Sequence, residues 1–137
     1  MPARTVKING KSYTVARMPL RAIRELDDLE SEAMALAAEV DGLDAQIGSL
    51  QQRLLALAEE GEATPEAVKD LTDQEAALGN RRRQVGWDQM DLRIRRLAVR
   101  LEGVMADELA ELIDVAGGEL GDLEEQLGRP FGQNQES

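Results

Sequence analysis

The side chains that could do chemistry in this sequence are carboxylates, arginines and a few serines, because the chain holds no histidine and no cysteine. Carboxylates are densest in a short stretch that contains Glu25, Asp27, Asp28, Glu30 and Glu32. Such a cluster could hold a divalent cation or act as an acid–base pair. No nitrogen or sulfur ligand accompanies it, and adjacent helical positions point in different directions. We therefore interpret it as a solvated or ion-paired helix face.

The sequence lacks the residues that usually activate a nucleophile or bind a phosphate. Ser12, Ser31 and Ser49 have no histidine to activate them, and no glycine-rich phosphate loop is present. The sequence therefore predicts a protein that is not an enzyme, with no catalytic residue, no cofactor-binding residue and no metal ligand.

Arginines between Arg81 and Arg100 could instead follow the phosphates of a nucleic acid. The net charge of -11 opposes such binding, and an aromatic content of 2% leaves few side chains for base stacking. Nucleic-acid binding through this face is kept as an alternative. No apolar run is long enough for a membrane span, so we expect no membrane partner and a cytoplasmic location.

The elements that must position these residues are mainly helical, and we expect one domain over residues 1–137. Residues 4–16 predict a β-hairpin, because Val6 and Ile8 alternate with polar residues before the turn pair Asn9-Gly10. Residues 19–60 predict a helix with an unbroken heptad seam that ends at Gly61. Thr64-Pro65 predicts the start of a second helix over 64–116, with a break near 103–106. Residues 119–137 predict a short helix and a flexible tail.

The short connection between the long helices favours an antiparallel, coiled-coil-like helical hairpin. In that register the acidic residues of 25–44 face the arginines of 80–99, which supports the arrangement. Val40 and Ile47 also permit a parallel dimer of the first helix, so homo-oligomerisation stays open. Glycines at Gly42, Gly48, Gly79 and Gly86 fall at one level, which indicates either close backbone approach or a flexible waist.

Several apolar residues could contact a partner protein. Trp87 lies where the seam of the second helix changes phase; core packing is favoured, and an exposed anchor is the alternative. Leu120, Leu123, Leu127 and Phe131 could cap the helices or dock into a partner's groove. The marginal β-hairpin needs support from the helices or from another chain. The predicted partner-binding residues are Val6, Ile8, Tyr13, Val15, Trp87, Leu120, Leu123, Leu127 and Phe131.

Residues 4–26 resemble the opening of phage tail assembly chaperones. The shared pattern is Lys7-Ile8-Asn9-Gly10-Lys11, then Tyr13-Thr14-Val15, then the step Pro19-Leu20-Arg21 into the first helix. The resemblance implies a non-enzymatic factor in the host cytoplasm that binds the tape-measure protein and recruits tail-tube subunits. Such proteins are often also made in a frameshift-extended form. A structural virion or scaffold coiled coil is the alternative.

Overall fold

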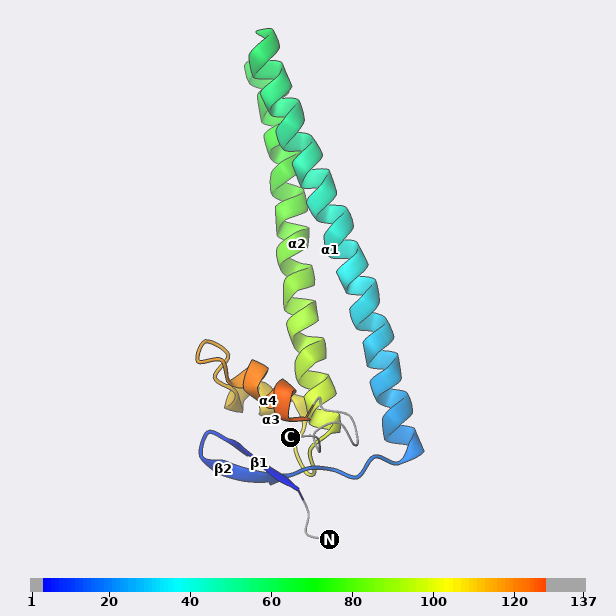
Figure 1. Cartoon of the computed structure of the whole chain (residues 1–137). Coiled ribbons are helices and arrows are strands. Elements are labelled where there is room, and N and C mark those ends of the chain that lie inside the picture. The colour runs from blue at the N-terminus through cyan, green and yellow to red at the C-terminus, as the bar shows by residue number, and fades with distance from the viewer. Residues whose placement is uncertain (1–3, 128–137) are drawn as a thin grey trace, which may run out of the picture. The chain divides into compact units, whose positions relative to one another are not determined.

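The computed structural model describes residues 4–127 and is mainly helical (Figure 1). In chain order the elements are β1 (Thr5–Ile8), β2 (Lys11–Thr14), α1 (Leu20–Glu60), α2 (Pro65–Val99), α3 (Ala106–Leu112) and α4 (Glu119–Leu127). These elements confirm the predicted fold class: a long helical hairpin, a small N-terminal β-hairpin and a short C-terminal helix. The predicted flexible tail after Leu127, with Phe131, lies outside the described residues.

The chain divides into two compact units. We call residues 1–31 and 91–137 the base unit, and residues 32–90 the hairpin unit. The base unit contains both strands, α3, α4, the beginning of α1 and the end of α2.

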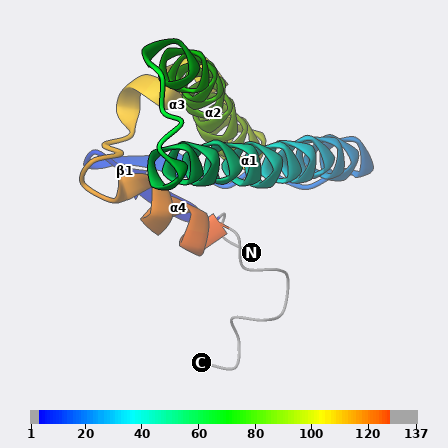
Figure 2. The same cartoon turned by 90° about the horizontal axis from the view of Figure 1, so that it is seen from above.

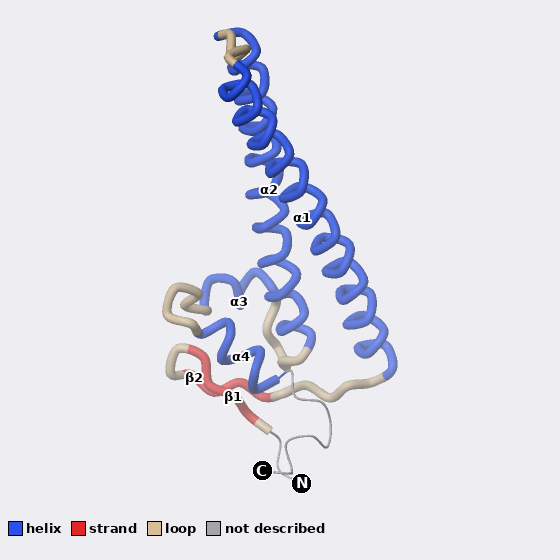
Figure 3. Tube along the Cα trace, turned by 45° about the horizontal axis from the view of Figure 1, so that its top comes forward, coloured by secondary structure: helices blue, strands red, loops and turns tan. Residues whose placement is uncertain are grey.

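In the hairpin unit, α1 and α2 run antiparallel along one apolar seam (Figure 3). Leu43 and Leu50 of α1 and Leu71 and Val85 of α2 are its buried residues. The other heptad positions of α1 in this unit are only half-buried, namely Ala33, Leu36, Val40, Ile47, Leu54 and Leu57. Two helices cover only one side of each other, so a seam of this kind buries few side chains fully.

The turn between the helices has the predicted caps. Gly61 adopts φ +72°, and the N–H of Glu62 donates to the carbonyl of Leu57 at 3.0 Å, as at a helix end closed by a left-handed residue. The Thr64 hydroxyl then accepts a 3.2 Å hydrogen bond from the N–H of Ala67, and Pro65 is the first residue of α2. These local bonds satisfy backbone groups that both helix ends would otherwise leave unpaired.

The four helix glycines of the hairpin unit do not mark close backbone approach. A Cβ built on Gly42, Gly48 or Gly79 would meet nothing within 4 Å, and one on Gly86 would meet only Arg82 Nη1 at 3.9 Å. The close-approach interpretation is therefore wrong, because a methyl group has room at each position.

In the base unit, β1 and β2 form the predicted hairpin. Asn9 and Gly10 adopt φ 53° and 81°, the left-handed pair that a type I′ turn requires, and Val6 lies opposite Tyr13. The support that this marginal hairpin needs comes from α4, which packs against β1 (Figure 2). The N–H of Asn9 also donates to Glu119 Oε2 at 3.1 Å.

Helix α2 ends at Val99 because the next residues pair with the β-hairpin. Val15 and Leu101 form an antiparallel bridge, with hydrogen bonds from Ala16 N–H to the Arg100 carbonyl at 2.7 Å and from Glu102 N–H to the Thr14 carbonyl at 2.9 Å. The break predicted near 103–106 thus spans 100–105, before α3 begins. This pairing ties the β-hairpin to the end of α2.

Candidate partner-binding site

Five of the predicted partner-binding residues lie in the core of the base unit. Val6 and Ile8 of β1 are buried, as are Leu120, Leu123 and Leu127 of α4. Between the two interpretations of the α4 leucines, their burial agrees with packing inside this chain. They are inaccessible to a partner while the base unit is folded.

The remaining predicted residues differ in exposure. Tyr13 and Val15 are half-buried; Lys11 Nζ lies 5.6 Å from the centre of the Tyr13 ring, and Val15 is held by its bridge to Leu101. Trp87 is 66% exposed, so the interpretation as a core residue is wrong. Its position explains the exposure, because Trp87 lies two residues after buried Val85 and so points away from the seam. Phe131 lies outside the described residues.

Residues 17–26, 93–106 and 124–127 of the base unit line two surface hollows that the sequence did not indicate. The larger, here the outer groove, has a volume of about 450 Å³. Its apolar lining comes from residues at the start of α1, the end of α2 and the start of α3, together with the segments before α1 and α3: Pro19, Ala22, Ala98, Val99, Val104, Met105 and Ala106. Met105 is 70% exposed, so an apolar side chain is presented directly to solvent at this groove.

The smaller hollow, here the arginine pocket, has a volume of about 280 Å³. Leu26, Leu97 and Leu127 supply its apolar lining, and Arg93, Arg96, Arg100 and Glu124 its charged groups. The three arginines follow one another by three and four positions, which places them on one face of the end of α2. That spacing, beside the seam residue Leu97, is the signal that could have identified the pocket from the sequence.

Positive charge is concentrated in these hollows, although the chain as a whole is acidic. Arg17, Arg21 and Arg95 line the outer groove, with Glu25 as its acidic lining residue. Together the two hollows are lined by six arginines and two carboxylates, whereas the chain has 16 basic and 27 acidic residues. Three of these arginines, Arg93, Arg95 and Arg96, have carboxylate partners within the chain. This local reversal of charge favours a partner segment that is acidic and partly apolar.

Two arginines of the arginine pocket are already paired. Arg93 donates to both carboxylate oxygens of Glu124, with Nε at 2.9 Å, and this hydrogen bonding raises the pKa of Arg93. Arg96 lies 2.9 Å from a carboxylate oxygen of Glu30. Their charges are largely compensated within the chain.

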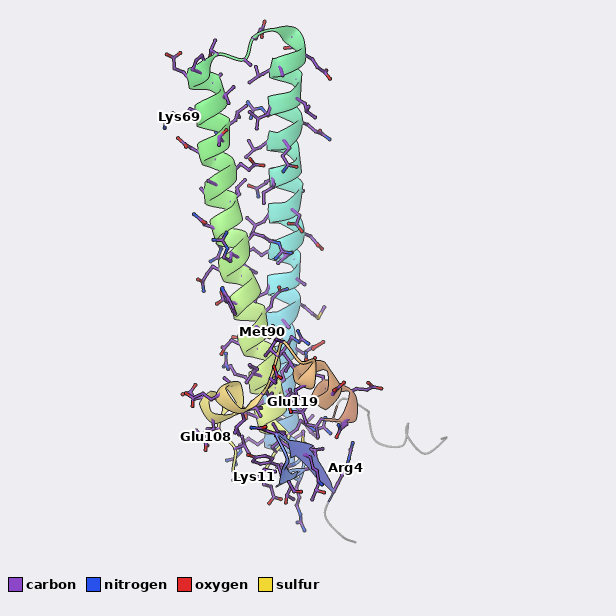
Figure 4. All side chains as sticks on the ribbon, turned by 90° about the vertical axis from the view of Figure 1, so that its left-hand side faces the viewer. Arg4, Lys11, Lys69, Met90, Glu108 and Glu119 are labelled. Carbon is purple, nitrogen blue, oxygen red and sulfur yellow. The ribbon has the colours of Figure 1, made fainter. Side chains whose placement is uncertain are left out.

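Arg100 is different. Its Nε is buried without a hydrogen-bond partner, and its guanidinium makes no ion pair with any residue from 4 to 127. Burial, and then the like charge of Arg4, lower the pKa of Arg100. Arg4 donates to the carbonyl of Gln126 in the same unit, where Figure 4 shows its side chain beside the β-hairpin. The pocket therefore holds one cation whose charge nothing in the described chain offsets.

Most of the arginines that could bind a nucleic acid form ion pairs with carboxylates of this chain. In the hairpin unit, Arg81 donates to both oxygens of Glu39 at 2.6 and 3.0 Å, which raises its pKa, and Arg82 donates to Asp44 at 3.1 Å. These pairs confirm the predicted register of acidic and basic helix faces. A phosphate backbone would have to displace carboxylates that are already in place.

Within residues 4–127, no group of three or more acidic side chains is arranged to hold a metal ion. None of the helices in that range is long and apolar enough to cross a membrane. Comparison of the chain with protein-family models, with curated proteins and with solved structures finds no match.

Proposed function

We propose that this chain is a non-enzymatic assembly factor that binds a protein partner through its base unit. The observation that carries the proposal is the outer groove, where exposed apolar side chains are bordered by arginines in an otherwise acidic protein. Apolar area supplies binding free energy, and the arginines select an acidic partner. Arg is also among the residue types enriched at interface hot spots.

The N-terminal resemblance gives the proposal a specific form. Residues 4–26 resemble phage tail assembly chaperones, and Pro19 and Arg21 from this stretch line the outer groove. On this basis we propose a phage tail assembly chaperone in the host cytoplasm that binds the tape-measure protein and recruits tail-tube subunits. The groove would contact the partner, and the bridge between Val15 and Leu101 would hold in place the segment that leads into the groove.

Affinity purification from cells in which the chain is naturally made tests this proposal. The tagged chain should retain tape-measure and tail-tube proteins, identified by mass spectrometry, and should be missing from finished particles. Its presence in finished particles would favour a structural virion or scaffold component. Retention of nucleic acid, with an affinity that falls steeply as salt rises, would favour the alternative through Arg81–Arg100.

A matched pair of variants locates the contact. Met105→Gln removes an exposed apolar side chain from the outer groove, whereas Met34→Gln removes one of similar exposure, 67%, from α1 in the hairpin unit. Both should stay folded, because neither side chain is buried. Recovery of the partner should fall for Met105→Gln only. Equal losses, or none, would move the contact away from the groove.

A further inference from the structure

We infer that the arginine pocket is a binding site for one carboxylate side chain of a partner protein, carried next to an aliphatic side chain. The inference extends the proposed function: it rests on that function for the choice of a protein segment as ligand, and it names the chemistry that the segment must present. Its basis is the combination of an apolar lining with a single uncompensated guanidinium.

Within residues 4–127, Arg100 lacks a hydrogen-bond acceptor at Nε and a carboxylate partner for its charge. An arginine side chain stays protonated at any ordinary pH, so burial cannot be relieved by loss of its proton. A buried N–H without an acceptor costs free energy, and partial burial of a charge without a counter-ion adds to that cost. Arg93 and Arg96 in the same pocket have such counter-ions in Glu124 and Glu30, and Arg100 has none. Arg100 is therefore the arginine of this pocket whose positive charge has no carboxylate partner among the described residues.

The charge of a ligand that would pair with Arg100 follows from these ion pairs. Among the three arginines that line the pocket, only Arg100 is without a carboxylate partner in the described chain, and the planar fork of its guanidinium fits the two oxygens of one carboxylate. A phosphate would bring a larger charge close to Glu124, which also lines the pocket. A carboxylate thus suits the pocket better than a phosphate.

The size and lining of the pocket indicate which kind of molecule would carry the carboxylate. A volume of about 280 Å³ lies at the small end of the roughly 300–1,000 Å³ typical of ligand sites, a size that suits a few side chains of a peptide. Leu26, the half-buried leucine of this lining, would contact the aliphatic neighbour of the carboxylate, and Leu97 and Leu127 lie buried behind it. A peptide with adjacent acidic and leucine-like residues meets both requirements.

The test uses the full-length chain and a short peptide, acetyl-Leu-Glu-Leu-amide, followed through the arginine Nε–H signals in ¹⁵N NMR spectra. The peptide should shift the Arg100 Nε–H signal and slow its exchange with solvent. The peptide with Gln in place of Glu should bind about ten-fold more weakly or worse, because a hydrogen bond to a charged group is lost. No shift at Arg100, or equal binding of both peptides, would overturn the site.

Variants separate binding from a structural role. Arg100→Gln should weaken peptide binding about ten-fold or more and raise the thermal midpoint, because an unpaired charge on a half-buried side chain is removed. Arg24→Gln, the same charge change at an exposed position of α1 in the base unit, should alter neither quantity. A lowered midpoint for Arg100→Gln, with peptide binding unchanged, would show that Arg100 is structural and would overturn the inference.

Two other occupants have distinct signatures. Sodium octanoate that binds more tightly than the peptide would assign the pocket to a fatty acid. A shift of the Arg100 signal caused by Glu136→Gln in the free protein would assign it to the chain's own C-terminal residues. In the affinity purification, partner recovery that is unaffected by Arg100→Gln would leave the proposed function standing and overturn only this site. Recovery of no partner would overturn the function, while the peptide spectra would still decide the pocket.

Discussion

The base unit and the hairpin unit use apolar residues in different ways. Among the described residues, twelve of the sixteen buried hydrophobic side chains belong to the base unit and four to the hairpin unit. Those of the base unit come from β1, all four helices and the loops between them, so they join segments far apart in the sequence. Those of the hairpin unit come from two helices that face each other. The base unit should therefore depend on its core, and the hairpin unit on helix-local interactions.

The largest expected effect is in the core of the base unit. Leu109 of α3 is 0% exposed, so Leu109→Ala should lower the free energy of unfolding by about 2–5 kcal/mol, measured by urea unfolding. Leu55→Ala, at a leucine of α1 that is 63% exposed, should change it by less than about 0.5 kcal/mol. Similar losses from both variants would remove the distinction between core and surface on which the comparison depends.

A smaller effect is expected at the cap of the hairpin unit. Thr64→Ala removes the hydroxyl that accepts the Ala67 N–H and should cost about 1 kcal/mol, seen in the same unfolding experiment. Thr72→Ala, at an exposed position within α2, serves as the control and should cost nothing, because alanine is the better helix former there. A cost at Thr72 equal to that at Thr64 would mean that the cap has no special role.

An effect of similar size but opposite sign is expected at the helix glycines. Gly48→Ala should raise the free energy of unfolding by about 1 kcal/mol, because the added methyl group meets nothing within 4 Å and alanine favours the helix. Gly10→Ala should do the reverse, since φ 81° disfavours any residue with a Cβ. Destabilisation by Gly48→Ala would restore the idea that the helices need a glycine there.

The smallest effect is expected from the surface ion pairs of the hairpin unit. A double-mutant cycle of Arg81→Gln and Glu39→Gln should give a coupling free energy that is smaller than the effects expected at Leu109, Thr64 and Gly48. Salt should reduce it further, because both side chains are solvent-exposed. A coupling that persists at high salt would show that charge pairing holds the helices together, in addition to selecting their register.

The features that the sequence predicted correctly are those determined by neighbouring residues. Heptad spacing gave the seam, Asn9-Gly10 gave the turn, and Gly61 and Thr64 gave the helix ends, because each rule acts within a few positions. The end of α2 at Val99 was not predictable in this way. It depends on pairing between Leu101 and Val15, which no local pattern reveals.

In the candidate site, too, contacts between residues far apart in the sequence could not be predicted from local patterns. Alternation in β1 and the spacing of the α4 leucines indicated that each had a buried face, but not that they would cover each other. Trp87 is large and apolar, which favoured burial, but its phase relative to Val85 decided its exposure. Arg100 carried a readable signal in its spacing from Arg93 and Arg96. Its unpaired state became visible only when Glu124 and Glu30 were placed beside its neighbours.

The bridge between Val15 and Leu101 bears on how the chain folds. The two residues are 86 positions apart, and closing a loop of that length in a disordered chain carries a large entropic cost. Antiparallel pairing of α1 and α2 can begin at the turn near Gly61 and proceed by short-range contacts, which shortens the remaining loop. We therefore expect the helical hairpin to form early and the β-hairpin to pair last. On the ribosome, the base unit would then stay open until α4 has been synthesised, and its apolar residues would be the last to leave water.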